Sequence, residues 1–263
     1  MFTTHFKMTG QPFAERAPVD RILADDRMTQ GLARLDYLAD QGTLGLLTGS
    51  TGTGKSTLLK LFLHRLPPNR YRPLYLHLTR VKATGFLKLL VAALGEQPQR
   101  GKERLFLQIL DRAKKSEHTA LLVLDEAHHL DPDTLTDLRL LISSALDDAP
   151  PLKLLLVGQE ALRDELKHNR HADLVNRISV RFHLLPLSKE QTAAYIDHQL
   201  TQAGASDKIF EPEVKNLIHD YAHGVPRLVN NLATACLIHA AIQKAQKVTE
   251  PLFHQVLPEF TLP

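Results

Sequence analysis

The feature that most constrains this chain is one loop with the pattern G-x-x-x-x-G-K-[ST]. Residues 49–56 read Gly-Ser-Thr-Gly-Thr-Gly-Lys-Ser, between an apolar run at 44–48 and a leucine-rich run at 55–66. A strand, a glycine-rich turn and a helix in this order form a phosphate-binding loop. Such a loop sits at the carboxyl end of a strand in a parallel α/β sheet. The sequence therefore predicts that the chain binds a nucleoside triphosphate.

The residues of this loop are expected to share the work of holding phosphate. The three glycines allow a tight turn, so that backbone N–H groups and the start of the following helix face phosphate oxygens. Lys55 should reach the β- and γ-phosphates, and the hydroxyl of Ser56 should coordinate Mg²⁺. The predicted nucleotide-binding residues of the loop are Gly49, Ser50, Thr51, Gly52, Thr53, Gly54, Lys55, Ser56 and Thr57.

Two acids follow an apolar run in the middle of the chain. Residues 120–126 read Ala-Leu-Leu-Val-Leu-Asp-Glu. A strand that ends in carboxylates places them at the carboxyl edge of a parallel sheet, where ligands bind. Asp125 is expected to bind the nucleotide's Mg²⁺, and Glu126 to activate the attacking water as a catalytic residue. Taken alone, the pair is equally consistent with two solvated acids; together with the loop it predicts ATP hydrolysis.

Apolar runs that alternate with helical patterns predict an α/β fold with a five-stranded parallel sheet between two layers of helices. The expected strands are 44–48, 74–78, 120–124, 153–157 and 179–184. The expected helices of this region are 28–40, 55–66, 84–94, 102–115, 131–147 and 160–167. Past Pro186 only helical patterns remain, at 188–204, 211–221, 225–243 and 250–257.

This organisation divides the chain into three expected parts. Residues 1–27 form an N-terminal arm, 28–186 a P-loop core, and 187–263 a small all-helical lid domain. Phe2, Phe6 and Phe13 are expected to hold the arm against the core.

The composition indicates the compartment of the chain more clearly than the reaction it carries out. The 263 residues are 43% hydrophobic and 23% charged, which is ordinary for a globular protein. A single cysteine, Cys236, excludes an intramolecular disulfide, and no apolar run approaches the roughly eighteen residues that cross a bilayer. We therefore expect a cytoplasmic chain with no membrane segment. The formal charge of +3 permits nucleic-acid binding without demonstrating it.

With these features the chain resembles the AAA+ ATPases over nearly its whole length. Besides the loop and the acids, Leu156-Val157-Gly158-Gln159 ends a strand where that family keeps a polar sensor of the γ-phosphate. The resemblance implies that Gln159 senses phosphate, although asparagine or threonine is commoner there. It also implies an arginine finger at Arg177, with Arg181 as the alternative, and a second arginine sensor at Arg227 that contacts nucleotide. Gln159, Arg177 and Arg227 thus join Glu126 as expected catalytic residues.

A narrower resemblance is to the ExeA-like and TniB/TnsC-like branch of these ATPases. It is carried by the arm motif His5-Phe6-Lys7-Met8…Gln11-Pro12-Phe13, by Asp125-Glu126-Ala127-His128-His129-Leu130, and by 180–188. ExeA-type secretion proteins continue into a membrane span, which is not expected in these 263 residues. The resemblance therefore implies an ATPase that forms a homo-oligomeric ring or helical filament on duplex DNA and regulates a transposase.

The resemblance places the DNA contacts after the second expected strand. Arg80, Lys82 and Thr84 are the expected DNA-binding residues, and a solvated basic loop is an equally good interpretation. The main alternative function is an ExeA-like secretion or other protein-assembly ATPase that does not act on DNA. A DEAH-type helicase, prompted by residues 125–128, ranks last because a helicase motor needs two such domains.

The histidines suggest no second metal at the sequence level. His128 and His129 are neighbours in the chain, so we expect their rings to point in different directions and to form no zinc pair. The Mg²⁺ of the nucleotide, held by Ser56 and Asp125, is the expected metal.

Overall fold

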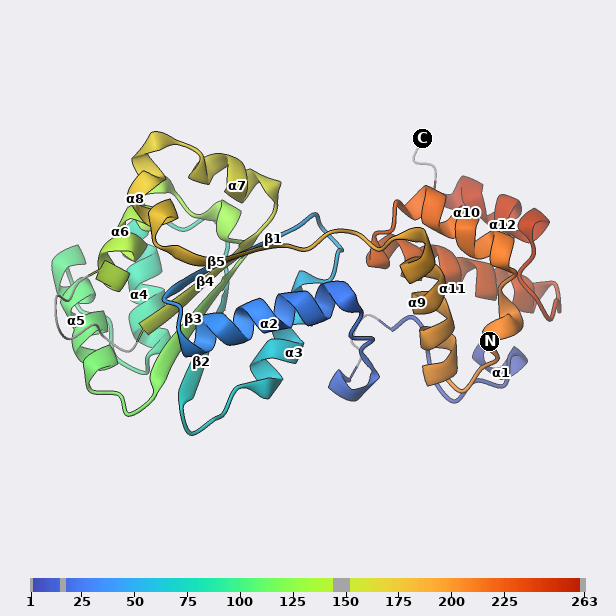
Figure 1. Cartoon of the computed structure of the whole chain (residues 1–263), viewed down its shortest axis with the longest axis horizontal. Coiled ribbons are helices and arrows are strands. Elements are labelled where there is room, and N and C mark those ends of the chain that lie inside the picture. The colour runs from blue at the N-terminus through green and yellow to red at the C-terminus, as the bar shows by residue number, and fades with distance from the viewer. Residues whose placement is uncertain (1, 15–17, 144–151, 261–263) are drawn as a thin grey trace. The chain divides into compact units, whose positions relative to one another are not determined.

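The computed structural model of the chain describes residues 2–14, 18–143 and 152–260 (Figure 1). The chain divides into two compact units, which are described separately. The sheet unit comprises Met28–Ser50 and Lys55–Leu184. The helical unit comprises Met1–Arg27, Thr51–Gly54 and Leu185–Pro263.

Five parallel strands form the centre of the sheet unit, in the order β2-β3-β4-β1-β5. They are β1 (Leu44–Thr48), β2 (Tyr71–His77), β3 (Thr119–Asp125), β4 (Leu152–Gly158) and β5 (Ile178–His183). The three inner strands are almost wholly buried, as is usual for parallel strands covered on both faces. Because all strands run the same way, their carboxyl ends meet at one edge of the sheet.

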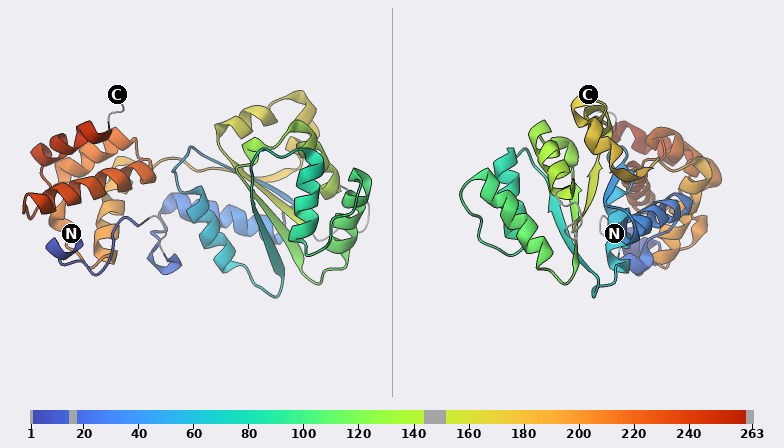
Figure 2. Two further views of the ribbon diagram at one scale, coloured as in Figure 1. Left: turned by 180° about the vertical axis from the view of Figure 1, so that it is seen from behind. Right: turned by 60° about the vertical axis from the view of Figure 1, so that its left-hand side comes forward.

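Helices cover both faces of this sheet, so the predicted three-layer α/β architecture is confirmed (Figure 2). The helices of this region are α2 (Asp26–Asp40), α3 (Lys55–Arg65), α4 (Ala83–Ala93), α5 (Lys102–Lys114), α6 (Pro132–Ser143), α7 (Glu160–Leu166) and α8 (Ala172–Asn176). Leu122, Leu124 and Leu154 pack with α4–α6 in one core cluster. On the other face, Lys153 Nζ donates to the carbonyl of Leu38 at 3.1 Å and so joins β4 to α2.

Two elements differ from the sequence-based expectation. Strand β2 begins at Tyr71 rather than at residue 74, with Pro73 inside it. Proline is tolerated here because β2 is an edge strand, where one side needs no ladder donor. The short helix α8 was not expected. The predicted end, at residue 147, of the helix expected from residue 131 lies outside the described residues.

The helical unit contains α1 (Phe2–His5), α9 (Lys189–Gln202), α10 (Pro212–Ala222), α11 (Pro226–Ile242) and α12 (Glu250–Val256). The expected capping box is present, because Ser188 Oγ accepts from the Gln191 N–H and the Gln191 side chain accepts from the Ser188 N–H. Across both units, short 3-10 turns lie at Val19–Arg21, Ala127–His129, Asn169–His171, Asp207–Ile209 and Leu257–Phe260. Within the described residues, no helix is both long and apolar enough to span a bilayer.

The N-terminal arm packs differently from the expectation. Phe2, Phe6 and Phe13 are buried in the apolar cluster of α9–α12, and not in the core of the sheet unit as the sequence had suggested. Two polar contacts accompany this packing: the His5 ring lies 2.7 Å from the Ala245 carbonyl, and Thr9 Oγ1 donates to that of Ala203. The prediction failed because an aromatic spacing does not specify which apolar surface it covers.

This packing predicts that Phe6→Ala destabilises the helical unit by about 3 kcal/mol, the lower end for a buried phenylalanine. Hydrogen exchange should speed up in α11 and stay unchanged in the strands. Ile242→Ala is the control, because that side chain is 73% exposed. Faster exchange in the sheet unit alone would contradict the arm's placement.

Candidate functional site

The phosphate-loop residues connect β1 to α3 (Figure 1). Gly52 and Gly54 have φ angles of +82° and +106°, values that side-chain-bearing residues rarely adopt. Lys55 opens α3 and is only 7% exposed. Its Nζ donates to the carbonyls of Gly49 at 2.7 Å and Ser50 at 3.0 Å. This set fits a phosphate group, because it combines a buried ammonium with a turn whose backbone needs glycine.

The remaining loop residues differ in exposure. Ser56 is exposed, Thr57 is half-buried, and Thr53 is fully buried. The Ser50 hydroxyl donates to Glu160 Oε1 at 3.2 Å. Because Ser56 is exposed, its hydroxyl is available to a cation that prefers oxygen ligands.

Asp125 ends β3 with its side chain 3% exposed and both carboxylate oxygens engaged. Oδ1 accepts the backbone N–H of Glu126 at 2.9 Å, and Oδ2 accepts the hydroxyl of Tyr75 at 2.5 Å. Burial and the neighbouring carboxylate raise the pKa of Tyr75, so that the phenol keeps its proton and remains a donor. A buried carboxylate on a strand tip suits a hard cation such as Mg²⁺.

Glu126 takes a backbone conformation that is uncommon for glutamate. Its φ and ψ are 57° and 36°, in the left-handed region. The Oε2 atom accepts from Gln159 Nε2 at 3.2 Å and lies 3.4 Å from His128 Nδ1. Residues in such sparsely populated conformations cluster at active sites and switch regions. The structure thus brings together three residues that the sequence singled out, Asp125, Glu126 and Gln159.

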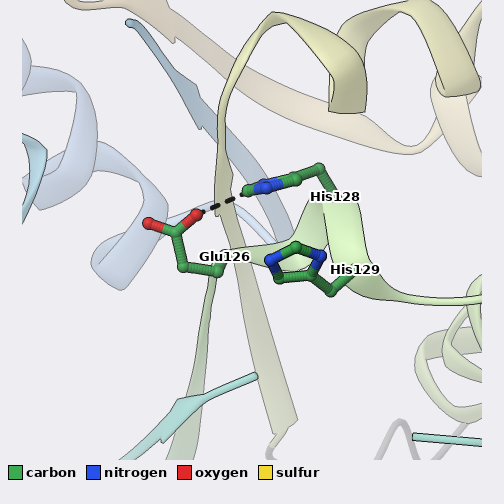
Figure 3. Close-up of side chains that lie close together, drawn as sticks. All are labelled: Glu126, His128 and His129. Carbon is green, nitrogen blue, oxygen red and sulfur yellow. Dashed lines mark ion pairs between the residues drawn. The ribbon is translucent and has the colours of Figure 1, made fainter. Parts of the chain in front are cut away.

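The two histidines after Glu126 contradict the expectation that they diverge. Their ring centroids are 4.1 Å apart with a tilt of 41°, and both lie beside Glu126 (Figure 3). Burial and the neighbouring His129 lower the pKa of His128, although Glu126 acts in the opposite sense. The backbone turn explains the error, because the divergence of adjacent side chains holds for regular elements and not for a 3-10 turn after a left-handed residue.

The predicted arginines occupy three separate positions. Arg177 follows α8 and is exposed. Arg181, its alternative, is also exposed and donates to the Val175 carbonyl at 2.8 Å. Arg227 lies in the first turn of α11, and its backbone N–H is 3.4 Å from the carbonyl of Gly52 in the same unit.

The three residues predicted to contact DNA lie in the segment that follows β2 and in the first turn of α4. Arg80, Lys82 and Thr84 are all exposed. None of them forms a salt bridge or a side-chain hydrogen bond with the part of the chain that the structure describes. They are therefore accessible to a polyanion.

Two residues near the acids were missed by the sequence-based analysis. Tyr75 bonds to Asp125, and His77 pairs with Asp125 in the β2–β3 register, with its Nδ1 3.8 Å from Oδ2. Polar side chains near the end of a strand were the available signal. The sequence does not show which strand pairs with β2, so this signal alone did not connect Tyr75 and His77 with the acids at the end of β3.

Comparison with known proteins relates this fold to a family. Residues 38–166 match the family model described as an AAA domain. General secretion pathway protein A of Aeromonas hydrophila is 31% identical over 258 residues. The match covers 94% of this chain and 46% of that protein, so this chain spans about half the length of its relative.

Solved structures show the same fold at low sequence identity. Cdc6p of Pyrobaculum aerophilum has a TM-score of 0.72 at 19% identity, covering 96% of this chain and 72% of that one. Aeropyrum pernix ORC1 in complex with DNA has a TM-score of 0.68 at 17% identity, covering 92% and 66%. The Thermotoga maritima RuvB Holliday junction branch migration motor has a TM-score of 0.64 at 16% identity, covering 95% and 74%.

The loop geometry predicts that Lys55→Ala loses ATP affinity by tenfold or more, since each hydrogen bond to a charged group contributes about 1.5–3 kcal/mol. Titration with a fluorescent ATP analogue measures this. Lys60→Ala, on an exposed position of the same helix, should bind like the parent chain. Equal affinity of the two variants would remove Lys55 from the nucleotide site.

Proposed function

We propose that this chain, whose core is an AAA-family ATPase domain, hydrolyses ATP with Mg²⁺ to drive or regulate a protein assembly of the secretion type. The observation that carries the ATPase activity is that the Lys55 loop and the acids Asp125 and Glu126 end strands of one parallel sheet. Burial is the main cause that lowers the pKa of His128 on the acid-bearing turn, and the charge of Lys55 acts in the same sense.

Each side chain has a defined task in this proposal. Ser56 and Asp125 hold the magnesium ion, which supplies charge neutralisation on the phosphates when bound. Lys55 leaves its carbonyl partners to bind the phosphates. Glu126 orients the attacking water and accepts its proton. Gln159 donates to the Glu126 carboxylate at 3.2 Å and so helps to orient it, and we propose that Gln159 also contacts the terminal phosphate.

The arginines extend the proposal to an oligomer. Arg177 is exposed and bonds to no described side chain, so it is free to reach nucleotide on a second copy of the chain. A guanidinium supplied in this way neutralises charge that develops on the transferred phosphoryl group. Arg181 remains the alternative finger. Arg227 on α11 is proposed to contact nucleotide within its own chain.

The secretion-type role rests on one named relative. General secretion pathway protein A matches along 94% of this chain, whereas the transposition role expected from the sequence has no support among the relatives described above. The alternative interpretation of the sequence is therefore preferred over its main one. The match covers 46% of that relative, so the proposal concerns the matched part alone.

Duplex DNA binding is kept as a second candidate because of one observation on this chain. Arg80, Lys82 and the potential donor Thr84 are all exposed within one short segment, and no described acid pairs with the two basic side chains. Contacts of this kind go to phosphates and carry no sequence preference.

Glu126→Gln is expected to retain ATP binding and to lower the turnover of ATP by roughly 10²-fold or more, the usual contribution of a general base. Single-turnover hydrolysis of labelled ATP measures this loss. Glu103→Gln on α5 removes an exposed carboxylate of the same unit and should leave turnover unchanged. Parent-like turnover of Glu126→Gln would refute the assigned base.

Duplex binding at several salt concentrations separates the two candidate roles. If DNA is a ligand, Lys82→Glu weakens binding and lowers the salt slope by about one unit or more, while Lys88→Glu on α4 has a smaller effect. If the role is protein assembly alone, neither charge reversal matters and duplex is not retained at low salt. Retention that is equal for both variants would dismiss the Arg80–Thr84 segment as the DNA contact.

A further inference from the structure

We propose that Glu126, His128 and His129 form a site for a zinc-class divalent cation, and that the bound cation removes Glu126 from ATP hydrolysis. The regulatory half of this inference rests on the proposed ATPase function, whereas the binding half does not. The three side chains meet on one turn at the carboxyl end of β3 (Figure 3).

The distances suit a compact cation. One ligand atom from each of the three residues lies within 4.8 Å of the others. His128 Nδ1 and Glu126 Oε2 are already 3.4 Å apart. Ligand atoms at 2.0–2.1 Å from a tetrahedral zinc ion lie about 3.3 Å from one another. The His129 ligand atom therefore has to move inward, and His129 is only half-buried.

The backbone explains why adjacent residues converge here. Glu126 takes the left-handed conformation, and the 3-10 turn Ala127–His129 follows directly. Together they turn the chain sharply after β3, so that the carboxylate and both rings fall on the same side. The two rings, whose centroids are 4.1 Å apart and whose planes are tilted by 41°, reflect this convergence.

The Nδ1 atom of His128 is also suited to coordinate a metal ion. Its Nδ1 is buried and makes no hydrogen bond, although Glu126 Oε2 is close by. A buried nitrogen without a partner is costly, and a cation would satisfy it. Nδ1 of a neutral imidazole offers a lone pair of the kind that a metal ion binds.

The donor set selects the class of cation. Two imidazoles and one carboxylate match zinc and related first-row ions, whereas Mg²⁺ and Ca²⁺ prefer oxygen ligands. Three protein ligands leave a fourth position for water. The site is therefore distinct in chemistry from the predicted Mg²⁺ ligands Ser56 and Asp125.

Occupation of this site has a direct consequence for Glu126. A carboxylate that donates a lone pair to a divalent cation is a weak base, so it no longer accepts the proton of the attacking water. Coordination also competes with the Gln159 Nε2 hydrogen bond to the same Oε2 atom. The expected effect is inhibition of turnover with ATP binding retained.

The binding half is tested by titrating Co²⁺ into untagged, nucleotide-free, full-length protein and following its visible absorption. One equivalent should give the intense bands of a four- or five-coordinate site. His129→Asn should lower the apparent affinity for Zn²⁺ by roughly tenfold or more in competition with a chromogenic chelator. His64→Asn, an exposed histidine on α3, is the matched control and should bind as the parent does. Equal loss in both variants, or no bands, overturns the site.

The regulatory half is tested by measuring Mg²⁺-dependent ATP turnover against rising Zn²⁺. The parent chain and His64→Asn should be inhibited at Zn²⁺ concentrations that saturate the Co²⁺-defined site, and His129→Asn should need about tenfold more. Inhibition that is identical in all three would overturn the regulation and point to displacement of Mg²⁺. Co²⁺ bands in a chain without any ATP turnover would refute the proposed function and leave the metal site standing.

Discussion

The parallel pairing of β3 with its neighbours is the constraint on which the candidate site depends. Backbone hydrogen bonds fix Asp125 opposite His77 and align Leu124 with Leu156, so the polar residues that follow these strands are held at one edge. Antiparallel pairing would have sent the acids and the β1 loop to opposite ends. The buried leucines of these strands pack against the helices that cover the sheet, and this packing stabilises the paired strands.

The turn after β3 shows how local strain and chemistry are linked. A left-handed glutamate is unfavourable, and it persists here because the Asp125 carboxylate accepts its N–H and Gln159 holds its side chain. The same turn brings His128 and His129 together. One backbone irregularity thereby serves both the proposed base of hydrolysis and the proposed cation site.

The helical unit has its own apolar core, to which the arm belongs. Phe6 and its two aromatic companions complete a cluster built by α9–α12, so the first residues of the chain stabilise the last ones. The relative found along most of the chain is a secretion protein, and its shared part is this combination of sheet and helices.

The sequence by itself determined the elements whose signals are local. The loop with Lys55, the acid pair, the five-stranded α/β architecture and the capping box of α9 follow from patterns within a few residues, because periodicity, glycine and apolar runs act over that range. Tertiary structure alone decided the partners of those elements. Tyr75 on β2 donates to Asp125 on the neighbouring strand β3. The N-terminal arm packs in the helical unit, and the rings of His128 and His129 lie close together. Each depends on which surfaces meet after the chain has folded, and no spacing along the sequence encodes that directly.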